Sequence, residues 1–378
     1  MKFKLLSNLQ DIEVSQWNAL TEKQYPFLNY HFLRAMETHQ CVGPDHGWIP
    51  RHLICTDDSD RLLGVLPMYE KHNSWGEFVF DYAWADAFHR AGIQYYPKLV
   101  NAIPFTPATG PRFLARDEDR DRISGLLVKA ARQVMNQGEF SGMHSLFLND
   151  DDYHQLSSEL TVTRIDCQFH WYNQNYESFE QFLTTLKSRK RKKIRQERRR
   201  VDEAGIEIKR LNGHTASPQD WSDFTSLYRQ IYDRKYGQPA FNLPFFMDIA
   251  ETMPDRILLV MAKKEGQNIA AALMYHDEDT LYGRHWGCRQ YIDCLHFELC
   301  YYQGIEFCIE NQIKVFDPGA QGEHKIARGF LPRKTRSLHW MAKSPFVEAI
   351  REFVDHERLG VTNYIRAAQN HSPYLESA

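Results

Sequence analysis

The stretch that decides the fold is LYGRHWGCRQYIDCLHFELCYYQGIEFCIENQIKVFDPGAQGEHKIARGF, residues 281–330. It opens with an alternating segment typical of a strand and continues through 295–312 with apolar spacing typical of a helix. A second short strand is expected at 314–319, followed by a polar loop that leads to Phe330. The order strand, helix, strand, loop predicts a mixed α+β unit.

The length and composition of the chain predict a globular protein with two domains. At 378 residues the chain exceeds what one hydrophobic core usually supports. Apolar residues make up 43% and charged residues 25%, as in soluble proteins. No apolar run reaches the roughly 18 residues of a membrane span, and the first residues lack a signal-peptide pattern. We therefore expect a cytoplasmic protein.

Seven cysteines are spread along the chain without a Cys-x-x-Cys pair. Their odd number and their spacing argue against a disulfide framework or a structural zinc site. We expect reduced thiols that pack as small apolar groups, and no metal site.

Charge is distributed unevenly. The segment Lys187–Arg200 holds ten basic residues and one acid, hence +9, so the rest of the chain carries −3 − 9 = −12. Such a concentration is typical of a polyanion-binding surface. Transfer RNA, with its dense array of phosphates, or an anionic membrane would fit it, whereas CoA offers only a few phosphates. The alternative interpretation is a solvated helix face. The candidate donor-binding residues on this segment are Arg189, Lys190, Arg191 and Arg195.

Two mixed segments of strands and helices follow each other in the sequence. We expect a first domain over 1–162 and a second over 163–345. Apolar spacing in the second predicts one long basic helix over 178–204, with Ser178 as its N-cap. A helical tail over 346–378 is expected to pack on the body.

Three blocks carry a resemblance to a known family. They are FEQFLTTLKSRKRKKIRQERRRVDEAGIEIKRL (179–211), the stretch at 281–330, and PFTPATGPRFL (104–114). The chain resembles the Fem-type aminoacyl transferases, which carry two tandem domains of the acyl-CoA N-acyltransferase (GNAT) fold. More narrowly, it looks like a bacterial family of predicted N-acyltransferases named for peptidoglycan biosynthesis or recognition. The resemblance implies an α+β fold with mixed sheets and two GNAT-like domains.

The same resemblance implies an acyltransferase that uses aminoacyl-tRNA or acyl-CoA as a co-substrate. Lys325 corresponds to the lysine that Fem enzymes place near the donor phosphate and the transferring carbonyl. The segment RQYIDCLHF (289–297) lacks the Q/R-x-x-G-x-G/A signature of CoA-dependent members, which argues against ordinary CoA binding.

Residue chemistry adds further candidates in the second domain. Glu298, His324 and Glu323 are candidate bases, because an attacking ammonium must lose its proton. The alternative interpretation is a set of satisfied polar groups in a helix and a hairpin connection. Arg328 is a candidate phosphate ligand, and Gly319 and Gly322 let the backbone approach a ligand.

Acceptor-binding candidates combine carboxylates, aromatics and an arginine. Alternation predicts Tyr282, Arg284, Trp286 and Cys288 on one strand face and His285 on the other. The alternative interpretation is a capped loop with one salt bridge for the residues of the first domain, and an aromatic core for those of the strand. The acceptor candidates are Asp81, Trp84, Asp86, Arg284, Trp286 and Tyr302.

These patterns lead to one hypothesis with two alternatives. The hypothesis is an N-acyltransferase that moves an acyl or aminoacyl group to an amine, with a small molecule or a cell-wall precursor as acceptor. The first alternative is an acetyl-CoA-dependent N-acetyltransferase of a small amine. The second is a non-catalytic module that recognises a peptidoglycan precursor or a nucleic acid.

Overall fold

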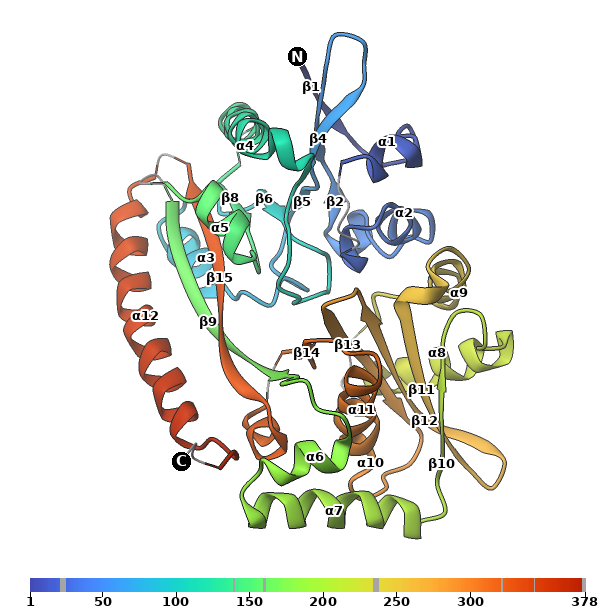
Figure 1. The fold of residues 1–378 in the computed structure, drawn as a ribbon. Coiled ribbons are helices and arrows are strands. Elements are labelled where there is room, and N and C mark those ends of the chain that lie inside the picture. Colours follow the sequence, from blue (N-terminus) through green and yellow to red (C-terminus); the bar gives the residue numbers. More distant parts are fainter. Residues whose placement is uncertain are drawn as a thin grey trace. The chain divides into compact units, whose positions relative to one another are not determined.

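The computed structural model describes residues 1–20, 25–138, 140–158, 161–233, 238–320, 322–342 and 344–375 (Figure 1). The chain divides into two compact units. Unit 1 comprises Met1–Cys167 and Lys334–Asn363, and unit 2 comprises Gln168–Arg333 and Tyr364–Ala378. Three elements contribute residues to both units: β9 (Thr161–Tyr172), β15 (Leu331–Met341) and α12 (Val347–Asn370).

Unit 1 contains a four-stranded sheet and a second series of strands. The sheet has the order β1-β3-β4-β7, and the second series runs β15-β8-β6-β5-β2, in which only β6 and β8 pair in parallel. The strands are β1 (Lys2–Leu6), β2 (Ile49–Pro50), β3 (His52–Thr56), β4 (Leu62–Leu66), β5 (Tyr69–Lys71), β6 (Lys98–Asn101), β7 (Leu114–Ala115) and β8 (Gly142–Ser145). The helices are α1 (Val14–Asn18), α2 (Tyr30–Thr38), α3 (Tyr82–Arg90), α4 (Arg120–Gln137) and α5 (Asp150–Leu156).

The core of unit 1 is built around α4. This amphipathic helix packs on β3, β4 and β7. Ile123 and Leu127 are buried in a cluster with Leu53 and Phe113. Apolar residues of α4 recur at helical spacing, so one stripe enters the core while the opposite face is charged.

Unit 2 contains antiparallel strands followed by one parallel strand. The order is β10-β11-β12-β13-β14-β9; β13 pairs with β14 in parallel, and the other neighbours are antiparallel. The strands are β10 (Glu207–Leu211), β11 (Ile257–Lys264), β12 (Gln267–His276), β13 (Thr280–Cys288) and β14 (Val315–Asp317). The helices are α6 (Phe179–Thr184), α7 (Ser188–Glu203), α8 (Pro218–Asp233), α9 (Leu243–Thr252), α10 (Leu295–Phe297) and α11 (Gln303–Glu310).

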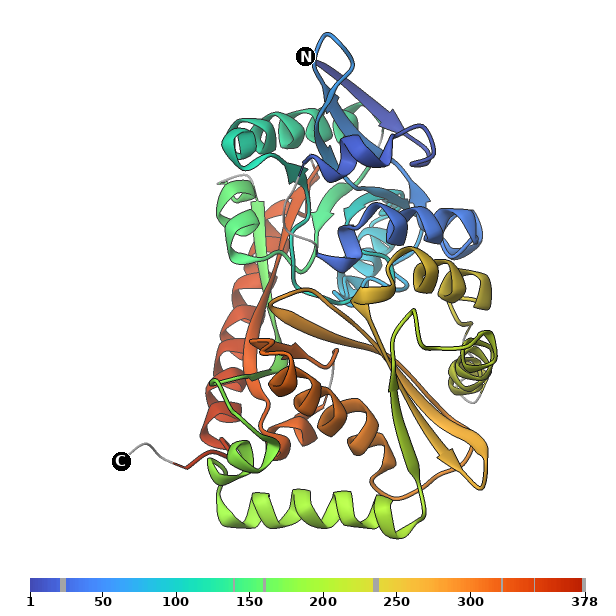
Figure 2. The ribbon, with the colours of Figure 1, turned by 45° about the vertical axis from the view of Figure 1, so that its right-hand side comes forward.

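Helices lie against both faces of the central strands of unit 2 (Figure 2). α8 packs on β12 and β13, while the turn between α10 and α11 packs on β11 and β12. Residues 257–262 of β11 are buried without alternation, as expected for a strand covered on both faces.

The predicted single helix over 178–204 is wrong. The structure has α6 and α7 instead, because Lys187 adopts an extended conformation with φ −52° and ψ 137°. The backbone there bonds to the C-terminal segment: Lys187 N donates to Pro373 O at 2.8 Å, and Leu375 N donates to Thr185 O at 2.9 Å. Lys187 N and Thr185 O thus form hydrogen bonds with the C-terminal segment, where a continuous helix would have paired them within itself.

The helix predicted at 295–312 is also irregular. A π-helical turn, η5 (Glu298–Tyr302), separates α10 from α11. The sequence pattern assumed regular four-residue spacing, which a π turn widens. Such turns frequently occur at functional sites.

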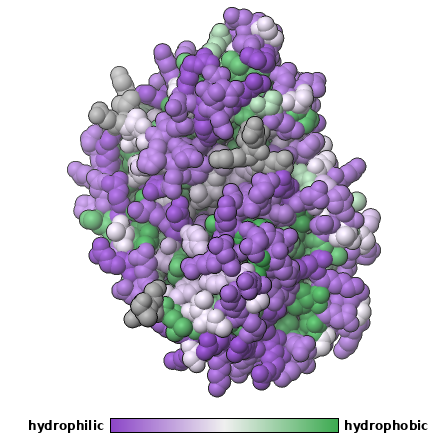
Figure 3. Space-filling model, viewed as in Figure 1, coloured by the Kyte–Doolittle hydropathy of each residue, from purple (hydrophilic) through white to green (hydrophobic). Residues whose placement is uncertain are grey.

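The surface shows no apolar belt in the view of Figure 3, where hydrophobic residues lie in separate small areas. The bottom of this view, over α7, is hydrophilic. Within the described part of the chain, helices that are both long enough and apolar enough to cross a membrane are absent.

Candidate active site

Lys325 lies in a short turn held between two glycines. The 3-10 helix η6 (Glu323–Arg328) follows Gly322 at φ 108° and ends at Gly329 at φ 99°, where a side chain would strain the backbone. Lys325 is 2% exposed, and its Nζ donates to Gly319 O at 2.5 Å. Burial lowers the pKa of Lys325 to about 8. The cation is therefore enclosed and only weakly compensated.

An ion pair next to this turn organises the end of β14. Arg284 Nη2 donates to Asp317 Oδ2 at 2.7 Å, and Gly319 N donates to Oδ1 of the same carboxylate at 2.9 Å. His170 Nε2 lies 3.8 Å from Asp317 Oδ1. Burial, the largest single influence, would raise the pKa of Asp317, but Arg284, His170 and the Gly319 N–H together outweigh it and hold this pKa below its ordinary value. Asp317 thus fixes the loop that carries Gly319.

A β-bulge in β13 overturns the predicted strand faces. The register shifts so that Tyr282 lies opposite Tyr275 and His285 opposite Leu273, while Trp286 and Cys288 lie opposite Ala272 and Ala270. Tyr282 and His285 therefore share one face, and Trp286 and Cys288 share the other. The bulge falls at Gly283 and Arg284, which releases Arg284 from the alternation and lets it reach Asp317.

Two histidines and two aromatic rings form a cluster next to Lys325. The ring of His296 contacts Trp286, Tyr301 and His324. Tyr301 Oη and His324 Nε2 lie 2.9 Å apart. Burial lowers the pKa of His296 to about 4, and partial burial with the nearby Arg328 and Lys325 cations lowers that of His324. Both imidazoles are neutral at pH 7 and can accept a proton.

Glu298 is placed differently from the other candidate bases. It is 3% exposed, and its carboxylate accepts from Arg198 Nη2 at 3.0 Å and from Gln303 Nε2 at 2.8 Å. Burial raises the pKa of Glu298. Glu323 is exposed at the start of η6. Of the three predicted bases, His324 is the one whose ring packs against His296 among the described residues.

Arg328 and Tyr302 meet at a carboxylate that the sequence analysis did not assign. Arg328 Nη2 donates to Glu197 Oε1 at 2.7 Å and its Nε to Oε2 at 3.1 Å. The hydroxyl of Tyr302 donates to the same carboxylate. Arg328 is therefore a buried partner of Glu197, with its charge balanced.

The basic helix presents one grooved face. A cavity of about 360 Å³ runs along α7, lined by Arg189, Lys192, Lys193, Gln196, Glu197 and Arg200. Of the predicted donor residues, Arg189 lies in this groove. Lys190 and Arg191 do not line it; Arg191 Nη1 donates to Thr184 O at 3.4 Å, and Arg195 pairs with Glu180 at 2.5 Å. Lys192, Lys193 and Arg200 are the cations that sequence spacing did not single out.

The predicted acceptor residues of unit 1 are divided between interior and surface. Asp81 and Trp84 are 1% and 2% exposed, whereas Asp86 is exposed and pairs with Arg90. Lys98 Nζ donates to Asp81 and, at 2.8 Å, to Glu77 Oε2. Asp81 thus belongs to a buried ionic cluster.

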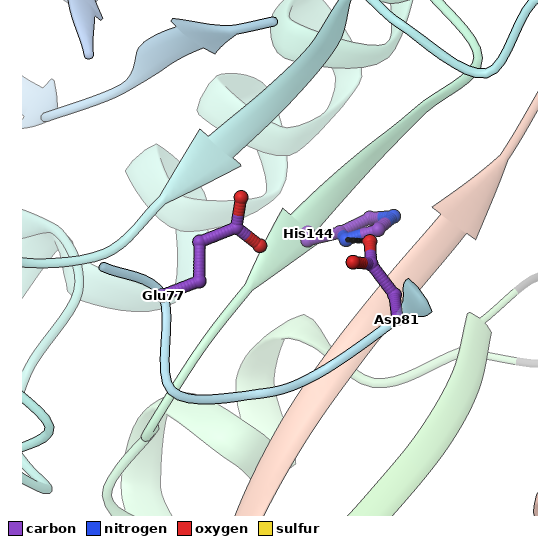
Figure 4. A group of neighbouring side chains, drawn as sticks. All are labelled: Glu77, Asp81 and His144. Atoms are coloured by element: carbon purple, nitrogen blue, oxygen red, sulfur yellow. Dashed lines mark ion pairs between the residues drawn. The ribbon is translucent and has the colours of Figure 1, made fainter. Parts of the chain in front are cut away.

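Glu77, Asp81 and His144 point toward one another and could offer three ligand atoms to a metal (Figure 4). These atoms lie within 4.8 Å of one another. Because Lys98 already supplies a cation to both carboxylates, a metal ion would have to displace a buried ammonium. Burial raises the pKa of Glu77 to about 7 and lowers that of His144 to about 3.

Known structures define the class of fold. FemX shares 11% identity with this chain at a TM-score of 0.53, covering 93% of this chain and 100% of its own. The C-terminal domain of a putative lysylphosphatidylglycerol synthetase from Agrobacterium fabrum shares 8% at a TM-score of 0.55, covering 91% and 95%. A conserved protein of unknown function from Bacteroides thetaiotaomicron shares 11% at 0.52, covering 88% and 99%. The predicted mixed α+β fold of tandem Fem type is confirmed.

The family follows from a whole-chain match. The FemAB-like model, described as peptidoglycan biosynthesis/recognition, matches residues 8–376. The chain belongs to the FemAB-like family, as its motifs predicted. A search of curated proteins found no match.

Besides the three groove cations, two acidic residues of the site were missed in the sequence. Glu197 is the single acid in the run Lys187–Arg200, and that isolation was the available signal. Asp317 stands in the quoted Asp-x-Gly of residues 317–319, but nothing in the spacing pointed to Arg284 as its partner.

Proposed function

We propose that this chain catalyses transfer of an acyl or aminoacyl group to an amine, with a peptidoglycan precursor as acceptor. The family description supports the acceptor class. The observation that carries the activity is the enclosed Lys325 cation beside two neutral imidazoles. This combination offers a positive charge and a proton acceptor within one small region of unit 2.

Each step of the reaction has a residue suited to it. His324, neutral at pH 7, takes a proton from the attacking ammonium, which frees the nitrogen lone pair. That lone pair forms the C–N bond at the donor carbonyl carbon, and the carbonyl oxygen becomes an oxyanion. Lys325 stabilises this oxyanion because its charge lies in a poorly solvated site. The C–O or C–S bond to the carrier then breaks with its electron pair on the carrier oxygen or sulfur, and this leaving group takes the second proton that the acylated nitrogen gives up.

The acyl donor is less narrowly defined than the acceptor. The α7 groove supports a donor with several phosphates, and aminoacyl-tRNA and acyl-CoA both satisfy this. Isothermal titration with acetyl-CoA separates them. Micromolar binding would support the CoA-dependent alternative, whereas absence of binding would support a nucleic-acid carrier.

The transfer reaction itself is tested by removing Lys325. We expect Lys325→Ala to lower kcat/KM about 10²–10³-fold, as for loss of one oxyanion-stabilising group. Lys314→Ala is the control, because Lys314 is an exposed lysine that pairs with Asp279. Transfer is measured with labelled aminoacyl-tRNA and acetyl-CoA against cell-wall precursor amines. Full activity of Lys325→Ala would contradict the proposal.

A further inference from the structure

Glu197 is a buried carboxylate in the middle of a basic helix. Its side chain is 7% exposed, and it accepts hydrogen bonds from Arg328 Nη2, Arg328 Nε and Tyr302. These partners come from η6 and from the π-helical turn η5. One carboxylate therefore joins α7 to both elements that carry the candidate site. A bidentate charged contact of this kind also fixes the orientation of the arginine.

Arg328 passes this constraint on to the turn that carries Lys325. Its Nη1 donates to His324 O at 2.7 Å, four residues earlier in the same turn. Its guanidinium lies over the ring of Phe297, 3.4 Å from the centroid. The backbone of η6 is thus held from one side by Arg328, while Lys325 Nζ is held on Gly319 O.

Glu197 also lines the α7 groove. Lys193 Nζ lies 3.9 Å from Glu197 Oε1, and this lysine is 55% exposed. A carboxylate in a cationic groove would oppose anion binding unless a cation balanced it, and Arg328 does so from the other side. An anion in the groove would attract Lys193 and repel Glu197, which would tighten the contact of Glu197 with Arg328.

We propose that Glu197 is a positioning residue that fixes the Lys325 turn through Arg328 and couples this turn to an anion bound in the α7 groove. The catalytic value of this coupling rests on the proposed function. The coupling itself does not, because it acts between the α7 groove and the Lys325 turn of the free protein. Coupling of binding free energies is reciprocal, so each site reports on the other.

The test follows the reactivity of Lys325 in the full-length protein. Acetic anhydride modifies neutral amines, so the rate of labelling at each lysine, read by peptide mass spectrometry across pH 6–11, gives a midpoint for Lys325. Wild type should titrate near pH 8, the pKa set by its burial. Inorganic pyrophosphate, filling the groove, should slow the labelling of Lys325. Several charged or titratable groups lie close enough to Lys325 for an electrostatic interaction with it. They are Asp317, Arg284, Cys300, His170, His296 and His324.

In Glu197→Gln the turn loses its anchor and Lys325 gains solvent, so its midpoint should rise by about one pH unit or more. Pyrophosphate should then no longer change its labelling. Asp202→Asn is the matched control: it removes one acid from the exposed end of α7 and should behave as wild type. The conservative Glu197→Asp should restore part of the pyrophosphate effect.

Glu197→Gln leaves Arg328 buried without its partner and can fail to fold. The double variant Glu197→Gln/Arg328→Gln removes both charges, and it should show the same raised midpoint. An unchanged midpoint with a retained pyrophosphate effect, in whichever of these variants folds, overturns the proposal. Because labelling needs no substrate, a failure of the transfer assay leaves this result standing.

Discussion

At the scale of single residues, the enclosed Lys325 and the Asp317–Arg284 pair depend on each other's charges. Lys325 has a lowered pKa because burial disfavours its ammonium form, and the Asp317 carboxylate only partly restores it. Asp317 is itself shared with Arg284, Gly319 N and His170. The charge of Lys325 is therefore only partly compensated and can change near physiological pH.

The first prediction concerns the alkaline limb of the pH profile. If the proposed role holds, kcat falls as pH rises through about 8, since Lys325 must be protonated to stabilise the oxyanion. Lys325→Arg keeps its charge above pH 12 and should extend activity to higher pH, though with a lower maximum. The measurement is kcat between pH 6 and 10. An alkaline limb at the same pH in both proteins would contradict the assignment.

The second prediction concerns the stability that Asp317 provides. Asp317→Asn removes the carboxylate that pairs with the buried Arg284 guanidinium, and we expect a loss of about 3–5 kcal/mol in the free energy of unfolding. The folded pKa of Asp317 lies below its unfolded value, so its contribution is present above about pH 4 and is lost as pH falls through the folded pKa. Urea unfolding of both proteins at pH 7 and pH 3 measures this.

For this second prediction, the double variant Asp317→Asn/Arg284→Gln should recover part of the loss, because no charge is then left unpaired. Equal stability of wild type and Asp317→Asn at pH 7 would refute it.

At the scale of elements, the helices of unit 2 are shaped by what packs against them. α11 passes close to β14 because Gly304 has no side chain: a Cβ there would lie 2.4 Å from Phe316 Cε1. Close packing against Phe316 thus explains a glycine, a poor helix former, inside α11. The division of α6 from α7 likewise accompanies tertiary contacts, the hydrogen bonds that residues 185 and 187 make with the C-terminal segment.

The third prediction compares two glycines within helices. Gly304→Ala should destabilise the protein by about 1–3 kcal/mol through overpacking against Phe316. Gly125→Ala, in α4, should stabilise it by about 0.5–1 kcal/mol, since its Cβ would meet no atom within 4 Å. Thermal unfolding of both variants beside wild type decides this. The same sign of change in both would count against the packing argument.

At the scale of the whole molecule, each unit has its own buried ionic arrangement. In unit 1, Lys98 is fully buried and joins Glu77 and Asp81. In unit 2, Glu197 and Arg328 play the corresponding part. Charges of this kind are costly to bury, and removing one partner is far more damaging than removing both.

The fourth prediction uses the fact that each unit has its own buried ionic cluster. Lys98→Met leaves two buried carboxylates without their cation and should cost unit 1 about 3–5 kcal/mol. Hydrogen exchange should then rise at residues of β5, β6 and β8 while β11 and β12 stay protected. Lys129→Met, on the exposed face of α4, is the control. An equal rise in both units would show that they unfold as one.

The sequence by itself determined the family, the mixed α+β class and the order of elements around residues 281–330, because these depend on local periodicity and on long motifs. It also marked Lys325 and the basic run. Only the tertiary structure decided how charges are paired: Asp317 with Arg284 across a β-bulge, and Glu197 with Arg328 across 131 positions. The register shift in β13 and the buried ion pairs join segments that are distant in the sequence, so no local pattern encodes them.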